Sequence, residues 1–147
     1  MSWNVVVSNR AGVRHILKGL KMPTAVISIH DPDKAPEFAQ DEEIANVRAI
    51  LTIPFWDEVD DVYGCMTREQ GEQVAAFVME QAPDVFNFVV NCEGGISRSA
   101  GVAAAISSAL NDDDFDFFRG RYVPNRVCYR RVLSAIWKLK VGKGASV

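Results

Sequence analysis

Four short stretches of the chain are almost continuously apolar and rich in β-branched residues. They cover residues 3–8, 24–29, 47–53 and 85–91. An apolar run of this length without alternation predicts a strand that is buried on both of its faces. The four stretches therefore predict a sheet that lies between two layers of other structure.

Segments with a helical spacing of apolar residues separate and follow these stretches, over residues 11–20, 67–81, 99–110 and 126–139. The second segment opens with Thr67 and Gln70 in the spacing of a capping box, which marks the start of a helix. Strands that alternate with helices predict an α/β domain. We expect a mostly parallel central sheet of four to five strands, flanked by helices.

A chain of 147 residues has the length of one domain, so residues 1–147 are expected to form a single unit, with a flexible tail over 142–147. The connection over 30–36 is polar and rich in proline, which predicts a surface loop. A second loop, over 54–66, carries the acidic residues Asp57, Glu58, Asp60 and Asp61.

Composition and charge exclude several classes of function. Apolar residues make up 48% of the chain, and 16 Lys and Arg against 19 Asp and Glu give a net charge of −3. We therefore expect no nucleic-acid partner and no membrane partner. The N-terminus does not resemble a secretion signal, and the three cysteines, Cys65, Cys92 and Cys128, have neither disulfide-framework nor zinc-site spacing. These features predict a cytoplasmic protein with reduced thiols and no metal or cofactor.

One segment, residues 88–101, combines features of a ligand site. Cys92 comes where a buried strand ends, Arg98 and Ser99 come where a helix begins, and Gly94 and Gly95 lie between them. Ligands of open α/β sheets bind at this carboxyl edge of the strands. The segment therefore predicts a binding loop between a strand and a helix.

The residues of this loop favour an anionic ligand. Gly94 and Gly95 allow the backbone to curl with its N–H groups inward, and the following helix adds the positive end of its dipole. Arg98 offers a planar fork that matches two oxygens of a phosphate-like group. The same field favours the thiolate form of Cys92, which would then face a bound tetrahedral anion as a nucleophile.

The pattern of cysteine, five residues, arginine and serine resembles the signature loop of the cysteine-dependent protein tyrosine phosphatases, in particular their dual-specificity branch. Residues 53–57 (Ile-Pro-Phe-Trp-Asp) resemble the stretch that brings the family's general acid, and Pro124-Asn125 before a final helix resembles the family's C-terminal section. The resemblance extends over about residues 25–139. It implies a phosphate-binding loop and hydrolysis of phosphomonoesters through a phosphocysteine.

The resemblance also implies a role for each matching residue. Cys92 would attack phosphorus, Asp57 would act as the general acid, and Ser99 would support the departing sulfur. Asp60 and Asp61 share the loop of Asp57, so the choice among the three carboxylates stays open. The phosphate oxygens would be held by the Arg98 side chain and by the backbone N–H groups of Glu93, Gly94, Gly95, Ile96, Ser97 and Arg98.

Two positions depart from the family pattern. Asn91 stands where the family has a histidine that orders the loop, although an amide can also donate and accept hydrogen bonds. Glu93 puts a carboxylate in the loop, and no Lys or Arg lies between Cys92 and Arg98. We therefore expect phosphorylated proteins or small phosphomonoesters as substrates, rather than highly charged inositol phosphates.

Two other functions stay open on the sequence. Loss of the histidine would suit a phosphate-binding pseudophosphatase with little turnover, and a cysteine in an anion-binding loop would also suit a sulfurtransferase of the rhodanese kind. A basic cluster near Pro124 either forms a solvated helix face or steers phosphorylated substrates. The cluster consists of Arg119, Arg121, Arg126, Arg130 and Arg131.

Overall fold

The computed structural model describes residues 2–39 and 41–145. The four expected strands and the four expected helices are present, and two short 3₁₀ turns, Ala82–Asp84 and Phe115–Phe117, join some of them. The strands and helices follow one another as β1 (Asn4–Asn9), α1 (Val13–Gly19), β2 (Thr24–His30), β3 (Val47–Pro54), α2 (Arg68–Gln81), β4 (Asn87–Cys92), α3 (Arg98–Asn111) and α4 (Arg126–Ala145).

The four strands form one sheet in the order β1-β4-β2-β3, and every neighbouring pair is parallel. The α/β architecture predicted from the alternation of strands and helices is therefore confirmed. In the register of the sheet, Asn91 of β4 lies between Ser8 of β1 and Ser28 of β2.

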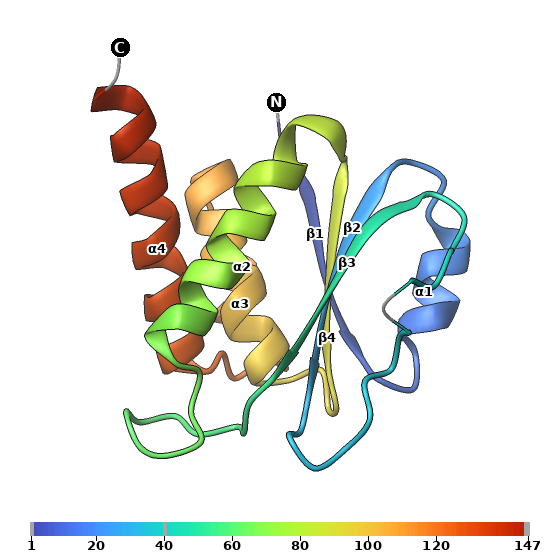
Figure 1. The fold of residues 1–147 in the computed structure, drawn as a ribbon, viewed down its shortest axis with the longest axis horizontal. Coiled ribbons are helices and arrows are strands. Elements are labelled where there is room, and N and C mark those ends of the chain that lie inside the picture. Colours follow the sequence, from blue (N-terminus) through green and yellow to red (C-terminus); the bar gives the residue numbers. More distant parts are fainter. Residues whose placement is uncertain (1, 40, 146–147) are drawn as a thin grey trace.

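Helices cover both faces of the sheet (Figure 1). Helix α1 packs on one face, over a small cluster that includes Val13, Leu17 and Val89. Helices α2, α3 and α4 cover the other face, over a larger core that includes Phe88, Val90 and Cys92. Successive residues of a strand point to opposite faces. Cys92 therefore points toward α3, and Asn91 points toward α1.

The prediction that all four strands are buried on both faces was wrong for two of them. Every residue of β2 and β4 is buried, but β1 and β3 are partly exposed. The order of the strands explains the difference, because β1 and β3 are the two edges of the sheet. An edge strand can be as apolar as a central one and still lack a second neighbour.

The chain near its C-terminus also differs from the prediction. Helix α4 continues to Ala145, six residues beyond the helix predicted over 126–139. The flexible tail expected over 142–147 stays a prediction, and residues 146–147 lie outside the described part. Gly142 suggested a stop, but glycine only lowers helix stability by about 1 kcal/mol and keeps its backbone N–H. By contrast, α2 begins as predicted, with the Thr67–Gln70 capping box formed.

The carboxyl ends of the parallel strands bring several loops to one edge of the sheet, at the bottom of Figure 1. The loops after β2, β3 and β4 start there, at Asp31, Phe55 and Glu93. Within residues 2–39 and 41–145, no helix has both the length and the apolar character needed to cross a membrane.

Candidate active site

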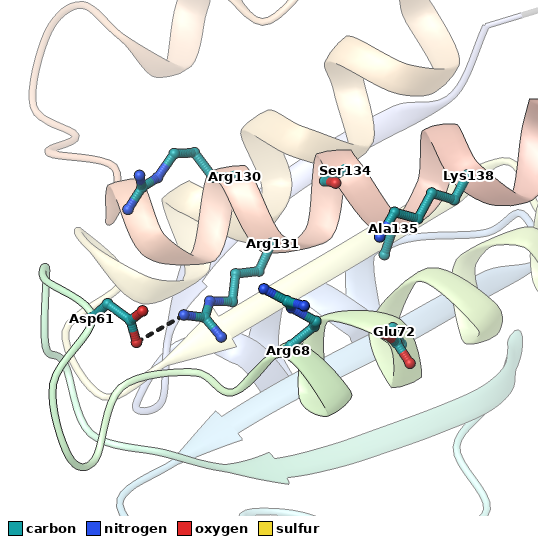
Figure 2. A pocket seen from close by; sticks show the side chains of 8 residues that line it. All are labelled: Asp61, Arg68, Glu72, Arg130, Arg131, Ser134, Ala135 and Lys138. Carbon is teal, nitrogen blue, oxygen red and sulfur yellow. Dashed lines mark ion pairs between the residues drawn. The ribbon is translucent and has the colours of Figure 1, made fainter.

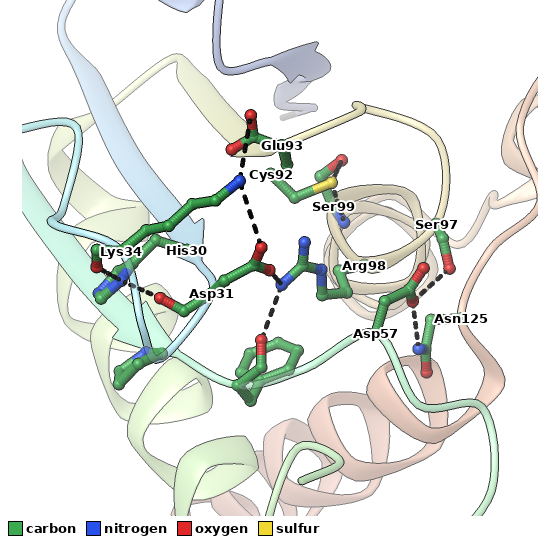
Figure 3. A network of polar contacts seen from close by, with 12 residues as sticks. His30, Asp31, Lys34, Asp57, Cys92, Glu93, Ser97, Arg98, Ser99 and Asn125 are labelled. Carbon is green, nitrogen blue, oxygen red and sulfur yellow. Dashed lines mark hydrogen bonds and ion pairs between the residues drawn. The ribbon is translucent and has the colours of Figure 1, made fainter.

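Cys92 ends β4, and its sulfur accepts hydrogen bonds from the loop and helix that follow it. The backbone N–H groups of Gly95 and Ser99 lie 3.3 and 3.4 Å from the Sγ atom. The Ser99 hydroxyl lies 3.1 Å from the same sulfur (Figure 3). Although only 3% of the Cys92 surface is exposed, the sulfur is surrounded by donors. The sulfur thus lies at the centre of a ring of donors formed by the loop and the start of α3.

The loop from Glu93 to Ser97 turns its carbonyl groups outward. The carbonyls of Glu93, Ile96 and Ser97 accept hydrogen bonds from the backbone N–H groups of Arg10, Val123 and Asn125, at 3.3, 3.0 and 2.9 Å. In a trans peptide the N–H points opposite to the C=O. The N–H groups of Gly94, Ser97 and Arg98 therefore point into the loop, which gives it the form of an anion-binding nest.

Gly95 gives the loop its close fit against β1. Its φ angle is +66°, in the left-handed region that other residues rarely adopt. A Cβ atom at this position would lie 2.6 Å from the backbone nitrogen of Asn9. Both the backbone angle and the space thus require glycine here.

The Arg98 guanidinium is held from one side. Its Nη1 atom donates to Asp31 Oδ1 at 2.8 Å and to the carbonyl oxygen of Phe55 at 2.7 Å. Within the described residues, its Nε and Nη2 atoms have no hydrogen-bond partner, so two parallel donors of the fork stay free. Figure 3 shows the guanidinium between Asp31 and Asp57. A guanidinium with this edge free matches two oxygens of a tetrahedral anion.

Asp57 lies beside the loop, as the sequence led us to expect for one acidic residue of this segment. Its Oδ1 atom accepts hydrogen bonds from the Ser97 hydroxyl at 2.7 Å and from Asn125 Nδ2 at 2.9 Å. Both contacts use the same oxygen. In the described part of the chain, Asp57 Oδ2 accepts no hydrogen bond.

The two other carboxylates of this loop face away. Asp60 pairs with Arg126, and Asp61 pairs with Arg131 at 2.9 Å. Their side chains are 67% and 76% exposed. Of the three candidates for a general acid, Asp57 is thus the one with a direct contact to the loop.

Glu93 points outward from the loop. Its side chain is 46% exposed, and its carboxylate lies 3.8 Å from the Lys34 ammonium. Lys34 also lies 3.6 Å from the Asp31 carboxylate. Glu93 and Ile96 therefore contribute backbone to the loop, while their side chains stand at its rim, where Ile96 is half exposed.

Asn91 does not replace the histidine that the family has at its position. Its side chain is 1% exposed, and neither amide atom has a hydrogen-bond partner within the described residues. The hydrogen-bonding capacity of the amide is therefore not used within the described residues, and the effect of Asn91 on activity stays open. The amide lies on the α1 face of the sheet, away from the sulfur, so the Cys92 environment is built without it.

Two residues of the site had no role assigned to them from the sequence, although Asn125 was part of the family resemblance. Asp31 orients Arg98, and Asn125 holds Asp57 while its Oδ1 atom accepts from the backbone N–H groups of Val127 and Cys128. Asp31 directly follows β2, so its place at the carboxyl edge of the sheet was a usable signal. Within the described residues, no group of three or more His, Cys, Asp or Glu side chains is arranged to hold a metal ion.

The other two cysteines have structural environments. Cys65 is buried at the end of the acidic loop, and its thiol donates to the carbonyl oxygen of Met66 at 3.4 Å. Cys128 is fully buried between α3 and α4. Burial raises the pKa of the Cys128 thiol well above its ordinary value, and the Asp57 carboxylate adds to this effect.

Comparison with known proteins gives a result for structure alone. No protein-family model matches the chain, and no curated protein matches its sequence. Among solved structures, human DUSP28 is 17% identical, with a TM-score of 0.61 over 94% of each chain. A mouse putative dual specificity phosphatase complexed with zinc tungstate is 18% identical, with a TM-score of 0.57, over 95% of this chain and 86% of that one.

The chain has the dual-specificity phosphatase fold. PTPMT1 in complex with PI(5)P is a further example of this fold, with 15% identity and a TM-score of 0.62 over 95% of this chain and 94% of that one. The dual-specificity phosphatase fold therefore extends over nearly the whole chain. At these identities the likeness concerns the fold, and the chemistry has to be argued from the side chains.

Proposed function

We propose that the chain is a cysteine-dependent phosphomonoester hydrolase that acts on phosphorylated proteins. The observation that carries this proposal is the environment of the Cys92 sulfur, which two backbone N–H groups and the Ser99 hydroxyl contact at 3.1 to 3.4 Å. These donors stabilise a negative sulfur and leave the loop around it ready to receive a tetrahedral anion.

In the first step, the Cys92 thiolate attacks the phosphorus of the substrate. A bond forms between sulfur and phosphorus, and the bond from phosphorus to the ester oxygen breaks. Asp57, protonated at Oδ2, gives its proton to that oxygen, so the leaving group departs as a neutral alcohol or phenol. The loop amides and the free edge of Arg98 bind the three other oxygens.

In the second step, a water molecule attacks the phosphocysteine. The Asp57 carboxylate takes a proton from the water, a new phosphorus–oxygen bond forms, and the sulfur–phosphorus bond breaks. The products are inorganic phosphate and the Cys92 thiolate, which Ser99 stabilises by donating its hydroxyl hydrogen. Asp57 is protonated again, so the chain returns to its starting state.

Release of para-nitrophenolate from para-nitrophenyl phosphate tests the proposal. We expect turnover in the presence of a metal chelator, because the positive field comes from Arg98 and the backbone. We expect no turnover in Cys92→Ser, whose oxygen is a far weaker nucleophile at neutral pH. Turnover that Cys92→Ser retains, or turnover that the chelator abolishes, would refute the phosphocysteine mechanism.

A second candidate, a phosphate-binding pseudophosphatase, is favoured by one observation. Within the described residues the buried Asn91 amide has no partner, so it does not supply the contacts that the family's histidine would make. Asn91→His separates the two candidates. A gain in turnover from a near-zero level would favour the pseudophosphatase, whereas a parent protein that turns over fully and gains little favours the enzyme. A sulfurtransferase is less well supported, because sulfur transfer needs no acid at the position of Asp57.

A further inference from the structure

A second site of positive charge lies outside the Cys92 loop, in a surface hollow of about 390 Å³ between α2 and α4 (Figure 2). Four cations and two carboxylates line it, so its lining has a net charge of +2, although the whole chain has a net charge of −3. We call it the basic hollow; it is lined by Asp61, Arg68, Glu72, Arg130, Arg131, Ser134, Ala135 and Lys138.

The charge comes mostly from α4, whose sequence RVCYRRVLSAIWKLKVGKGA contains no Asp or Glu. Arg126 and Arg130 are four residues apart and therefore neighbours on the helix surface, and Lys138 follows Arg130 two turns later on the same face. Asp60 pairs with Arg126, so Arg130 and Lys138 are the cations of this face without a carboxylate partner in the described part of the chain.

Among residues 2–39 and 41–145, one of the four cations has a carboxylate partner. Arg131 pairs with Asp61 at 2.9 Å, and Figure 2 shows the Arg68 guanidinium beside this pair. Within the described residues, Arg68 and Lys138 have no carboxylate partner, and Arg130 donates only to the backbone carbonyl of Arg126. Three cations of the basic hollow are therefore available to a ligand.

The packing of α2 on α4 fixes the width of the hollow. At Gly71 the two helices approach so closely that a Cβ atom would lie 2.9 Å from Arg131 Cβ and 3.0 Å from the Arg131 carbonyl oxygen. Arg68 stands almost one turn before Gly71, at the start of α2, and so faces α4 across the hollow. The cations thus project from two rigid helices rather than from loops.

The basic hollow adjoins the loop that carries Asp57. Asp61 of this loop lines the hollow, and Asn125, which bonds Asp57, directly precedes α4. Arg130 is five residues beyond Asn125, which corresponds to about 7.5 Å along the helix axis. An extended peptide spans about 3.3 Å per residue, so two phosphates three to six residues apart span about 10–20 Å.

We propose that the basic hollow binds a second phosphate group of a doubly phosphorylated protein substrate, a few residues from the phosphate at Cys92. This inference rests on the proposed function, because it assumes a substrate at Cys92. A phosphomonoester carries a charge of about −2 at neutral pH, which matches the net charge of the lining. The planar guanidinium of an arginine such as Arg68 can donate two parallel hydrogen bonds to the oxygens of a phosphate.

Equilibrium binding to the Cys92→Ser protein tests the proposal without any need for turnover. The probes are fluorescent peptides that carry phosphotyrosine alone, phosphoserine alone, or both, with the phosphoserine placed about three to six residues away on either side. We expect the best doubly phosphorylated peptide to bind roughly tenfold more tightly than the phosphotyrosine peptide, the effect of two or three partly exposed ion pairs.

Two triple variants show where this gain in affinity arises, since each removes three positive charges. Arg68→Gln, Arg130→Gln and Lys138→Gln together should abolish it. The matched control Lys18→Gln, Lys21→Gln and Arg48→Gln changes the net charge equally, at exposed cations outside the basic hollow, and should keep the gain.

A gain that is absent at every spacing, that survives the substitutions in the hollow, or that disappears equally in the control would overturn the proposal. It would also be overturned if the hollow variant lost only its binding to phosphatidylserine vesicles, since the face would then contact membranes. Loss of phosphotyrosine binding alone, with phosphoserine binding still sensitive to the hollow, would instead overturn the proposed function and keep the basic hollow as an anion site.

Discussion

Cys92 and Cys128 are both buried thiols, and both lie near the start of a helix, yet their surroundings are opposite. Cys92 receives hydrogen bonds from two backbone N–H groups and contacts the Ser99 hydroxyl. Within the described residues, the Cys128 sulfur has no hydrogen-bond partner, and burial raises the pKa of its thiol.

The difference comes from the way in which each helix begins. Asn125 accepts from the first N–H groups of α4, including that of Cys128 itself, so no donor is left for the sulfur. No side chain caps α3, and its N-terminal N–H groups face the sulfur and the loop interior. An uncapped helix start keeps its unpaired donors for a ligand, whereas the cap of α4 occupies the N–H groups nearest to Cys128. Burial alone therefore does not decide what a thiol does.

The largest expected effect is the difference in turnover between substitution of Cys92 and substitution of Cys128. Cys92→Ser should lower turnover of para-nitrophenyl phosphate by at least about a thousandfold, because the nucleophile is lost. Cys128→Ser should keep turnover within a few-fold, but it should lower the free energy of unfolding by about 1–3 kcal/mol, because it buries a hydroxyl without a partner. Steady-state assays and urea unfolding measure both quantities. Equal losses of turnover in the two variants would contradict the comparison.

Asp57→Asn tests the proposed general acid of the reaction at Cys92. We expect turnover to fall by about 10²–10⁴-fold with a phenyl ester, because the leaving oxygen then receives no proton. The loss should be much smaller with a substrate whose leaving group is stable as an anion. Rates for a series of aryl phosphates, measured on parent and variant, check this expectation. Asp60→Asn is the control, and a loss of the same size there would move the acid to Asp60.

Arg98→Lys tests the fork that faces the loop. An ammonium keeps the charge but cannot offer two parallel donors, so we expect a loss of about 10²–10³-fold in kcat/KM. Binding of tungstate to the variant should weaken as well, and isothermal titration would measure it. Arg126→Lys is the matched control, because Arg126 is an exposed arginine of α4 that pairs with Asp60. Turnover unchanged in Arg98→Lys would mean that the fork does not hold the phosphate.

The smallest expected effect concerns the pH dependence of stability. The folded state raises the pKa of Cys128 above its ordinary value of 9.0, so the unfolded chain loses this proton first. Cys128 therefore stabilises the fold fully below about pH 9, and its contribution falls by about 1.4 kcal/mol per pH unit above that. Urea unfolding between pH 8 and 10.5 should show a steeper decline in the parent than in Cys128→Val. Parallel curves would indicate that the Cys128 pKa is not raised.

The part of the site that could be predicted from sequence is the part that is local in the chain. Cys92, Ser99 and the loop between them lie within eight residues, so the end of a strand and the start of a helix placed them correctly. The roles of Asp31 and Asn125 were missed because their contacts with Arg98 and Asp57 join residues 67 and 68 positions apart. Such pairs depend on the order of the strands, which apolar patterning does not encode.

The fold shows the same division. Alternation of strands and helices predicted the architecture, and the Thr67–Gln70 capping box predicted the start of α2. The burial of β1 and β3 was overestimated, because an apolar run does not reveal whether a strand has one neighbour or two. The sequence also did not reveal that the Asn91 amide lacks a partner among the described residues. An amide can always donate and accept hydrogen bonds, and whether it does so depends on the side chains that the fold brings near it.

The position of β4 between β1 and β2 has a consequence for how the molecule assembles. The two flanking strands are synthesised long before the strand that joins them, and within the described residues β4 is the strand that pairs with β1. A growing chain therefore cannot complete the sheet before residue 92 has been synthesised. Closure over such long sequence separations is slow. The sulfur that we place at the centre of the chemistry thus arrives with the strand that completes the sheet, so no shorter nascent chain contains a finished site.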